Sequence, residues 1–137
     1  MICKASTIVS LAKQEVGYHE KASNDNLNSK TANCGTANWN KYAAYIDKNF
    51  PNFYNTPKNG FDWCDIFVDY LFLKSFGYKN AMRLLCQPEK SAGAGCPYSY
   101  NYYVAKGRAR TYPNIGSQIF FDYGTGIAHT GIVVGYD

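Results

Sequence analysis

The segment from Asp62 to Phe76 constrains the fold more than any other part of this sequence. It is the most apolar stretch of the chain, reading DWCDIFVDYLFLKSF, and Gly77 follows it as a candidate helix C-cap. Apolar side chains would fall on nearly all sides of a helix with this sequence, which is typical of a helix that other elements surround. We therefore predict a central, buried helix over Asp62–Phe76.

Two shorter amphipathic helices are predicted before this segment. Ser6–Val16 has apolar side chains at helical spacing and stops at Gly17, and Trp39–Ile46 repeats that spacing before a proline-containing turn. The residues between them, Tyr18–Asn38, are polar and rich in Asn, Ser, Thr and Gly. This composition indicates a long loop.

The last part of the chain changes to the pattern of strands. A short helical stretch over Ala81–Leu85 precedes it, and then Gln118–Tyr123 and Thr130–Tyr136 are rich in Ile, Val, Phe and Tyr. Gly124 and Gly126 lie between these runs, which favours two antiparallel strands joined by a turn. Helices followed by strands predict an α+β fold, with N-terminal helices packed on a C-terminal antiparallel sheet.

Length and composition limit the possible classes of protein. A chain of 137 residues, 46% hydrophobic and 18% charged, suits one globular domain spanning residues 1–137. No apolar run reaches the roughly 18 to 20 residues that cross a bilayer. Met1–Ser10 also lacks the succession of basic, long apolar and small-residue segments that marks a secretory signal peptide. The net charge of +4 comes from scattered lysines and arginines, so we expect no membrane span and no nucleic-acid binding.

The number of cysteines is odd. There are five, so at least one thiol stays unpaired within the chain (Cys3, Cys34, Cys64, Cys86 and Cys96). With Cys64 set aside, the other four can pair in three ways, Cys86 with Cys96 closing the shortest loop, or all can stay reduced and buried. No two cysteines have zinc-ligand spacing, and neither His19 nor His129 has a neighbouring histidine, so no metal site is predicted.

Cys64 is the candidate nucleophile. Asp62 occupies the expected N-cap position and Asp65 lies three residues later, which predicts a capping box with Cys64 in the first helical turn. At this position the helix dipole and free backbone N–H groups stabilise a thiolate. We therefore expect the pKa of Cys64 to lie below the ordinary thiol value of about 8.5. The backbone N–H of Cys64 is also the leading oxyanion-hole candidate, with Asp62 and Asp65 as supporting residues. The alternative is a small buried hydrophobe.

His129 is the candidate base. It follows the glycine turn at the start of the last predicted strand, where its ring projects from a rigid element. Cys and His partners of a catalytic pair are commonly distant in sequence and adjacent in space. A structural or simply solvated histidine is the alternative. Trp63, beside the cysteine, and Tyr123, at the end of the first predicted strand, are candidates to line a substrate groove; Trp63 can equally pack in the core.

Three pieces of the sequence carry a resemblance to a known family. They are an N-terminal helix ending in EVGYHE, the block GFDWCDIFVDYLF, and the pair GSQIFFDYG and AHTGIVVGYD. Together they resemble the CHAP family (cysteine, histidine-dependent amidohydrolase/peptidase) of phage endolysins and bacterial autolysins. The resemblance implies a papain-like fold, Cys64 as nucleophile, His129 as general base and acid, peptidoglycan as substrate, and no cofactor.

Two departures from the family pattern concern the sheet. Ser117 stands where the family usually has Asp after Gly. The family's third group, which orients the histidine, lies on the strand after the histidine strand, and the sequence stops at Asp137 before it. We expect that the sheet is truncated at Asp137 and that its exposed edge can pair with another chain. The alternative is that Asp65 or Asp122 orients His129.

The expected function is therefore hydrolysis of an amide bond in bacterial peptidoglycan, by an N-acetylmuramoyl-L-alanine amidase or an endopeptidase. Such an enzyme is secreted or otherwise delivered to the cell wall and can be phage-encoded. Two alternatives stay open. One is a Cys-His peptidase or acyltransferase that acts on a non-wall peptide, and the other is an inactive wall-binding or chain-pairing module of the same fold.

Overall fold

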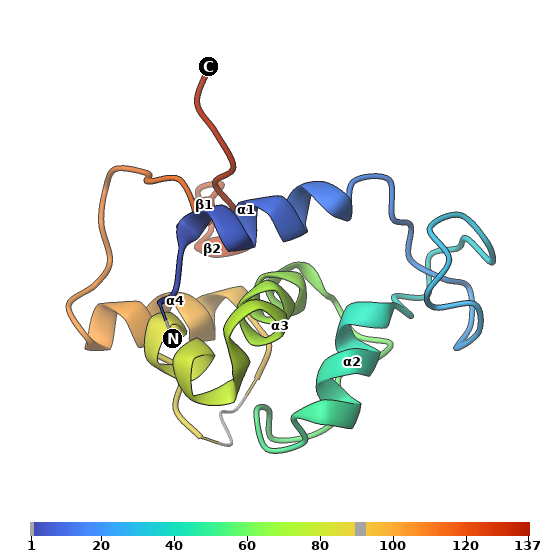
Figure 1. Ribbon diagram of the computed structural model, residues 1–137. Coiled ribbons are helices and arrows are strands. Elements are labelled where there is room, and N and C mark those ends of the chain that lie inside the picture. The colour runs from blue at the N-terminus through green and yellow to red at the C-terminus, as the bar shows by residue number, and fades with distance from the viewer. Residues whose placement is uncertain (1, 90–92) are drawn as a thin grey trace.

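The chain folds into four helices and one β-hairpin, as the computed structural model of residues 2–89 and 93–137 shows (Figure 1). The prediction of an α+β fold is confirmed. The elements are α1 (Ala5–Gln14), α2 (Lys41–Asn49), α3 (Cys64–Leu85), α4 (Cys96–Ala105), β1 (Gln118–Asp122) and β2 (Ile127–Ile132).

Helix α3 is the centre of the molecule, as its apolar sequence predicts. The other three helices and β2 all pack against it, and its side chains from Ile66 to Leu73 include many of the most buried in the chain. Burial on all sides explains why this helix lacks a polar face. Within the described ranges, no helix is both long and apolar enough to cross a membrane.

Gly77 kinks α3 and does not end it, so the expected C-cap at this position is wrong. Its backbone angles, φ 80° and ψ 176°, are not helical, yet the helix resumes and continues to Leu85. Ala81 and Leu85 are buried in the same core, which holds the second half of the helix in place. The helix ends instead at Leu85, with Cys86 as its C-cap in a left-handed conformation, φ 56°.

The first two helices lie close to their predicted positions. α1 begins one residue before the expected Ser6 and ends two residues before Val16, whose side chain is exposed. α2 begins after Asn40, whose side chain accepts a hydrogen bond from the Ala43 N–H at 2.9 Å. This N-cap explains why the helix starts later than Trp39. The segment between the helices is a loop, as predicted.

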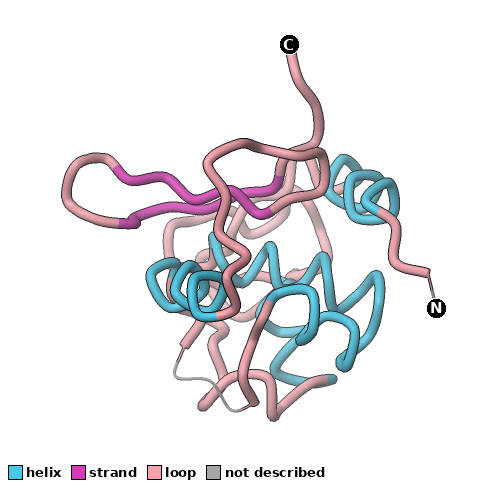
Figure 2. The backbone as a smooth tube through the Cα atoms, turned by 90° about the vertical axis from the view of Figure 1, so that its left-hand side faces the viewer, coloured by secondary structure: helices cyan, strands magenta, loops and turns pink. Residues whose placement is uncertain are grey.

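The two strands form an antiparallel hairpin that extends beyond the helices (Figure 2). Its register places Phe121 opposite His129 and Phe120 opposite Thr130. Two backbone N–H groups of the turn donate to the Asp122 carboxylate, at 2.8 Å from Gly124 and 3.1 Å from Gly126. The second strand starts earlier than predicted and ends at Ile132. Val133 makes two more backbone bonds, as donor to Ser117 and as acceptor from Gly116, before the chain leaves the hairpin.

Candidate active site

Cys64 is the first residue of α3, but Asp62 does not cap the helix as expected. The N-cap is Trp63, which makes no side-chain capping bond. Its indole stacks on Tyr42 with ring centroids 5.5 Å apart, and this packing fixes the start of the helix. The Asp62 carboxylate instead accepts a hydrogen bond from Asn38 at 3.4 Å. The predicted capping box is therefore wrong, while Cys64 still occupies the first turn.

The sulfur of Cys64 lies in surroundings that favour its thiolate. It shares a hydrogen bond with the sulfur of Cys96, 3.3 Å away, and this contact is the largest influence on the pKa of Cys64. Partial burial opposes ionisation, but hydrogen bonds from the His129 ring and the Asp65 backbone N–H favour it. Together these contacts lower the pKa of Cys64 to about 5. At neutral pH the sulfur is therefore an anion.

His129 reaches this sulfur from the hairpin. It is the third residue of β2, and its ring stacks on Phe121 of β1 with centroids 5.8 Å apart. The structure thus brings together the two residues that the sequence analysis paired. They border a cleft of about 470 Å³, whose lining residues are Asn38, Asp62, Trp63, Cys64, Phe67, His129 and Thr130.

Neither aspartate considered as the orienting group for His129 contacts its ring. Asp65 is fully buried and accepts hydrogen bonds from Ser99 and Gln118. Asp122 accepts from the amides of the hairpin turn. The hydrogen bonds of both carboxylates go to other groups, so the described residues give no support to either as the orienting group. The imidazole interacts with Cys64 and stacks on Phe121.

Asp65 instead belongs to a buried network that joins the helices to the hairpin. Ser99 of α4 donates to its carboxylate at 2.6 Å, and the Gln118 amide of β1 donates at 3.0 Å. The same amide donates to Thr130 of β2 at 3.0 Å, and the Tyr103 hydroxyl donates to the Gln118 carbonyl at 2.9 Å. We call these five residues the polar clamp. It fixes α3, next to Cys64, to the strand that carries His129.

The polar clamp also changes the chemistry of Asp65. Burial raises the pKa of this carboxyl to about 7, and the charge on Cys64 adds to the rise. The hydrogen bonds from Ser99 and Gln118 oppose it by favouring the carboxylate. A carboxyl next to the candidate nucleophile thus changes charge near neutral pH.

The two groove candidates have different places. Trp63 both packs in the core, on Tyr42, and lines the cleft, so the two roles proposed for it coexist. Tyr123 is not among the residues that line the cleft, so its place in a substrate groove stays a prediction. It follows the irregularity between Phe121 and Asp122 in the strand pairing, so its ring lies outside the cleft at the turn, 69% exposed and stacked on Phe121.

Cys96 is the functional residue that the sequence analysis did not single out. Of the alternatives left open for the cysteines, the structure has the reduced one, since all five are free thiols, and the sulfur of Cys96 adjoins that of Cys64. It is the first residue of α4, just before Pro97, as Cys64 is the first of α3. Proline favours the first turn of a helix, so the Cys-Pro pair was the available signal.

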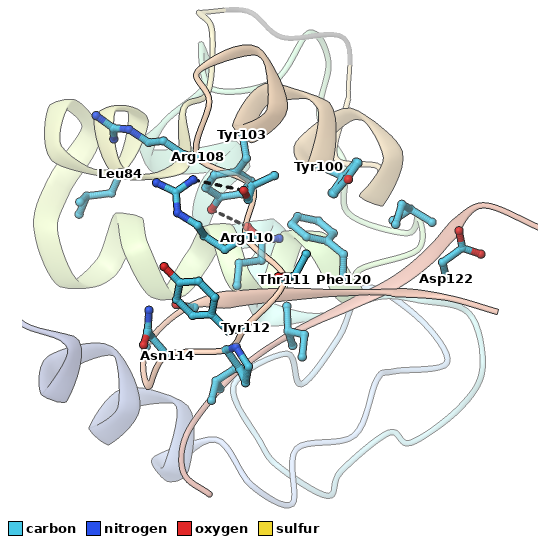
Figure 3. Close-up of a pocket in the computed structure, with 18 of the residues that line it drawn as sticks. Leu84, Tyr100, Tyr103, Arg108, Arg110, Thr111, Tyr112, Asn114, Phe120 and Asp122 are labelled. Carbon is cyan, nitrogen blue, oxygen red and sulfur yellow. Dashed lines mark hydrogen bonds between the residues drawn. The ribbon is translucent and has the colours of Figure 1, made fainter. Parts of the chain in front are cut away.

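A second cavity, of about 770 Å³, lies between α4, the loop of residues 106–117 and β1 (Figure 3). Its wall includes tyrosine rings and two arginines, one of which, Arg110, donates to the carbonyls of Gly107 and Ala109 in its own loop. The cavity shares no lining residue with the cleft at Cys64. Tyr103 and Gln118 of the polar clamp form part of its wall.

Comparison of the chain with protein-family models, with curated proteins and with solved structures found no match.

Proposed function

We propose that this protein is a papain-like cysteine hydrolase of the CHAP type, which cleaves an amide bond in bacterial peptidoglycan. The observation that carries the proposal is the contact between a cysteine at the start of a buried helix and a histidine on the hairpin, both of which line the same cleft. Their position at an open cleft gives a peptide access to the sulfur. A thiolate paired with an imidazole is the usual arrangement of a cysteine hydrolase.

In the proposed first step, the Cys64 sulfur attacks the carbonyl carbon of the scissile amide. The developing oxyanion lies near the first turn of α3, where the N–H of Cys64 has no acceptor within the helix. As the C–N bond breaks, the His129 imidazolium gives its proton to the leaving amine. The product of this step is a thioester on Cys64 and a free amine.

In the second step, neutral His129 takes a proton from a water molecule, which attacks the thioester carbonyl. The C–S bond breaks and releases a carboxylic acid, and the thiolate–imidazolium pair is restored. No cofactor takes part in either step. Phe121 and the strand pairing restrain the ring of His129, which supports this role without a carboxylate partner.

The substrate class is supported by the motifs WCDIFV and HTGIVVG, which resemble those of the CHAP family and here contain the two residues in contact. An enzyme of this kind acts outside the cytoplasm or on the wall from within, so we propose that the protein is delivered to the cell wall. The net charge of +4 is compatible with an anionic wall polymer.

The test is release of soluble muropeptides from purified cell walls by the full chain and three variants. Cys64→Ala is expected to abolish release, and His129→Ala to reduce it by about 10²- to 10⁴-fold. Cys34→Ala is the matched control, because Cys34 is an exposed thiol on the polar loop outside the cleft, and it should keep full activity. Mass analysis of the products identifies the bond, between sugar and peptide or within the peptide.

The other outcomes distinguish the alternatives. Release that survives Cys64→Ala contradicts the mechanism. Binding to walls without release by any form of the chain favours a binding module. Cleavage of soluble peptides, with the same dependence on Cys64 but without release from walls, favours a peptidase or acyltransferase with a non-wall substrate.

A further inference from the structure

The first residues of two helices meet at one pair of sulfur atoms. Cys64 begins α3, Cys96 begins α4, and their sulfurs are 3.3 Å apart. The two residues differ in access. Cys64 lines the cleft, whereas the Cys96 side chain is buried and is not part of the cleft wall. A reagent that enters the cleft therefore meets Cys64 first and finds Cys96 immediately behind it.

The pair favours the proton on Cys96 over Cys64. The hydrogen bond between the sulfurs lowers the pKa of Cys64 and raises the pKa of Cys96, so one sulfur is an anion and its neighbour a neutral thiol. A low-pKa, accessible cysteine next to a second thiol is the arrangement found in redox-sensitive cysteine pairs. The two sulfurs need to approach by only about 1.3 Å to reach the length of a disulfide bond, about 2.05 Å.

We propose that Cys64 and Cys96 are a redox-active pair, which a hydroperoxide converts to an intramolecular disulfide and a small thiol reductant restores. This reaction goes beyond the proposed hydrolase function and does not depend on it. In the oxidised form Cys64 has no thiolate to attack a carbonyl, so the disulfide is the resting state of the nucleophile in an oxidising environment.

The reaction has two steps. The Cys64 thiolate attacks the terminal oxygen of the hydroperoxide, the O–O bond breaks, and the leaving alkoxide or hydroxide takes a proton from the solvent, which leaves a sulfenic acid on Cys64. The Cys96 sulfur then attacks the Cys64 sulfur and gives up its proton. The S–O bond breaks and water leaves, so two electrons pass from the two thiols to the peroxide.

Reduction follows thiol–disulfide exchange. One molecule of a dithiol such as dithiothreitol attacks the bond, forms a mixed disulfide, and closes its own ring to release both cysteines with their protons. The proximity of Cys96 has a second consequence. Because it captures the sulfenic acid, Cys64 is protected from further oxidation to sulfinic acid, which is irreversible with ordinary thiols.

The experiment treats the full chain with hydrogen peroxide, alkylates the remaining thiols under denaturing conditions, and maps disulfides by mass spectrometry of tryptic peptides. Lysine or arginine residues separate Cys64, Cys86 and Cys96 in sequence, so each falls on its own peptide. We expect a crosslinked peptide that joins Cys64 to Cys96, lighter than the two thiol peptides by two hydrogen atoms. Dithiothreitol should remove it completely.

Two variants complete the test. In Cys96→Ser, Cys64 should proceed to sulfinic acid that dithiothreitol does not reverse, whereas Cys34→Ser, the control, should retain the Cys64–Cys96 crosslink. A crosslink between Cys86 and Cys96, or a Cys64 that oxidises to sulfinic acid in the unmodified chain, overturns the proposal. Disulfide mapping of the chain without substitutions tests the proposal even if Cys96→Ser does not fold. No step of the experiment requires hydrolase activity.

Discussion

The ionisation of Cys64 depends on a neighbouring thiol, and replacing Cys96 by alanine isolates that dependence. The Cys96 hydrogen bond is the first of the causes that lower the pKa of Cys64 to about 5, ahead of His129. A hydrogen bond to a charged group contributes about 1.5 to 3 kcal/mol. Since about 1.4 kcal/mol corresponds to one pKa unit, Cys96→Ala is expected to raise the pKa of Cys64 by about 1 to 2 units.

Magnitudes decide how this pKa is best measured. At pH 6.5 a thiol of pKa about 5 is roughly 100-fold more ionised than one of pKa about 8.5. A thiolate of lower pKa is less nucleophilic, however, by roughly 40-fold over 3.5 units. The two effects nearly cancel, so the rate of alkylation at a single pH says little. The midpoint of the rate against pH reports the pKa itself.

The assay is therefore alkylation by iodoacetamide across the pH range, with modification of the Cys64 peptide quantified by mass spectrometry. The exposed thiol of Cys34 reports in the same samples any effect of pH on the reagent. A midpoint near 5 that rises in Cys96→Ala supports the reasoning. A Cys64 midpoint near that of a free thiol, or one that rises in His129→Ala and not in Cys96→Ala, refutes it.

Three further outcomes concern stability, each measured by thermal or urea denaturation. The pKa of Asp65 is about 7 in the folded chain and about 3.9 in the unfolded chain, so the free energy of unfolding should fall by up to about 4 kcal/mol as pH rises through this range. Asp65→Asn should remove this contribution to the pH dependence, and an unchanged pH dependence contradicts the assignment. The Cys64–Cys96 disulfide closes a loop across a separation of 32 residues, so the peroxide-treated chain should gain about 4 kcal/mol and roughly 10 °C in Tm, a gain that dithiothreitol reverses; an equal Tm in both forms contradicts it. Leu71→Ala, at a fully buried position, should cost about 2 to 5 kcal/mol, and a cost below about 1 kcal/mol contradicts its central place.

Local patterns in the sequence predicted much of the architecture. The spacing of apolar side chains located α1, α2 and the first half of α3, and the glycines at 124 and 126 located the hairpin turn. Each of these signals acts within a few residues of the chain. The glycine rule failed at Gly77 because burial of Ala81 and Leu85 keeps the chain helical after the kink.

Only the site residues that lie within sequence motifs could be predicted. Cys64 and His129 stand in recognisable sequence blocks, and the structure places them in contact. The partners of Asp65 are 34 and 53 residues away along the chain, in α4 and β1, and no local pattern announces such bonds. The failure of the Asp62 cap has a similar cause, since the packing of Trp63 on a distant Tyr42 decides where α3 begins.

The contact between Cys64 and His129 depends on the packing of one hairpin against the helices, which the polar clamp holds in place. Cys64 belongs to the most deeply buried helix, whereas His129 sits on two strands that pair only with each other in the described chain and project past the helices (Figure 2). If the hairpin swings away, the imidazole leaves the sulfur while the helical core stays folded. Warming should thus separate the reacting pair before it melts the helices, and the bonds that join Gln118 to Asp65 and to Tyr103 set the temperature of that first event.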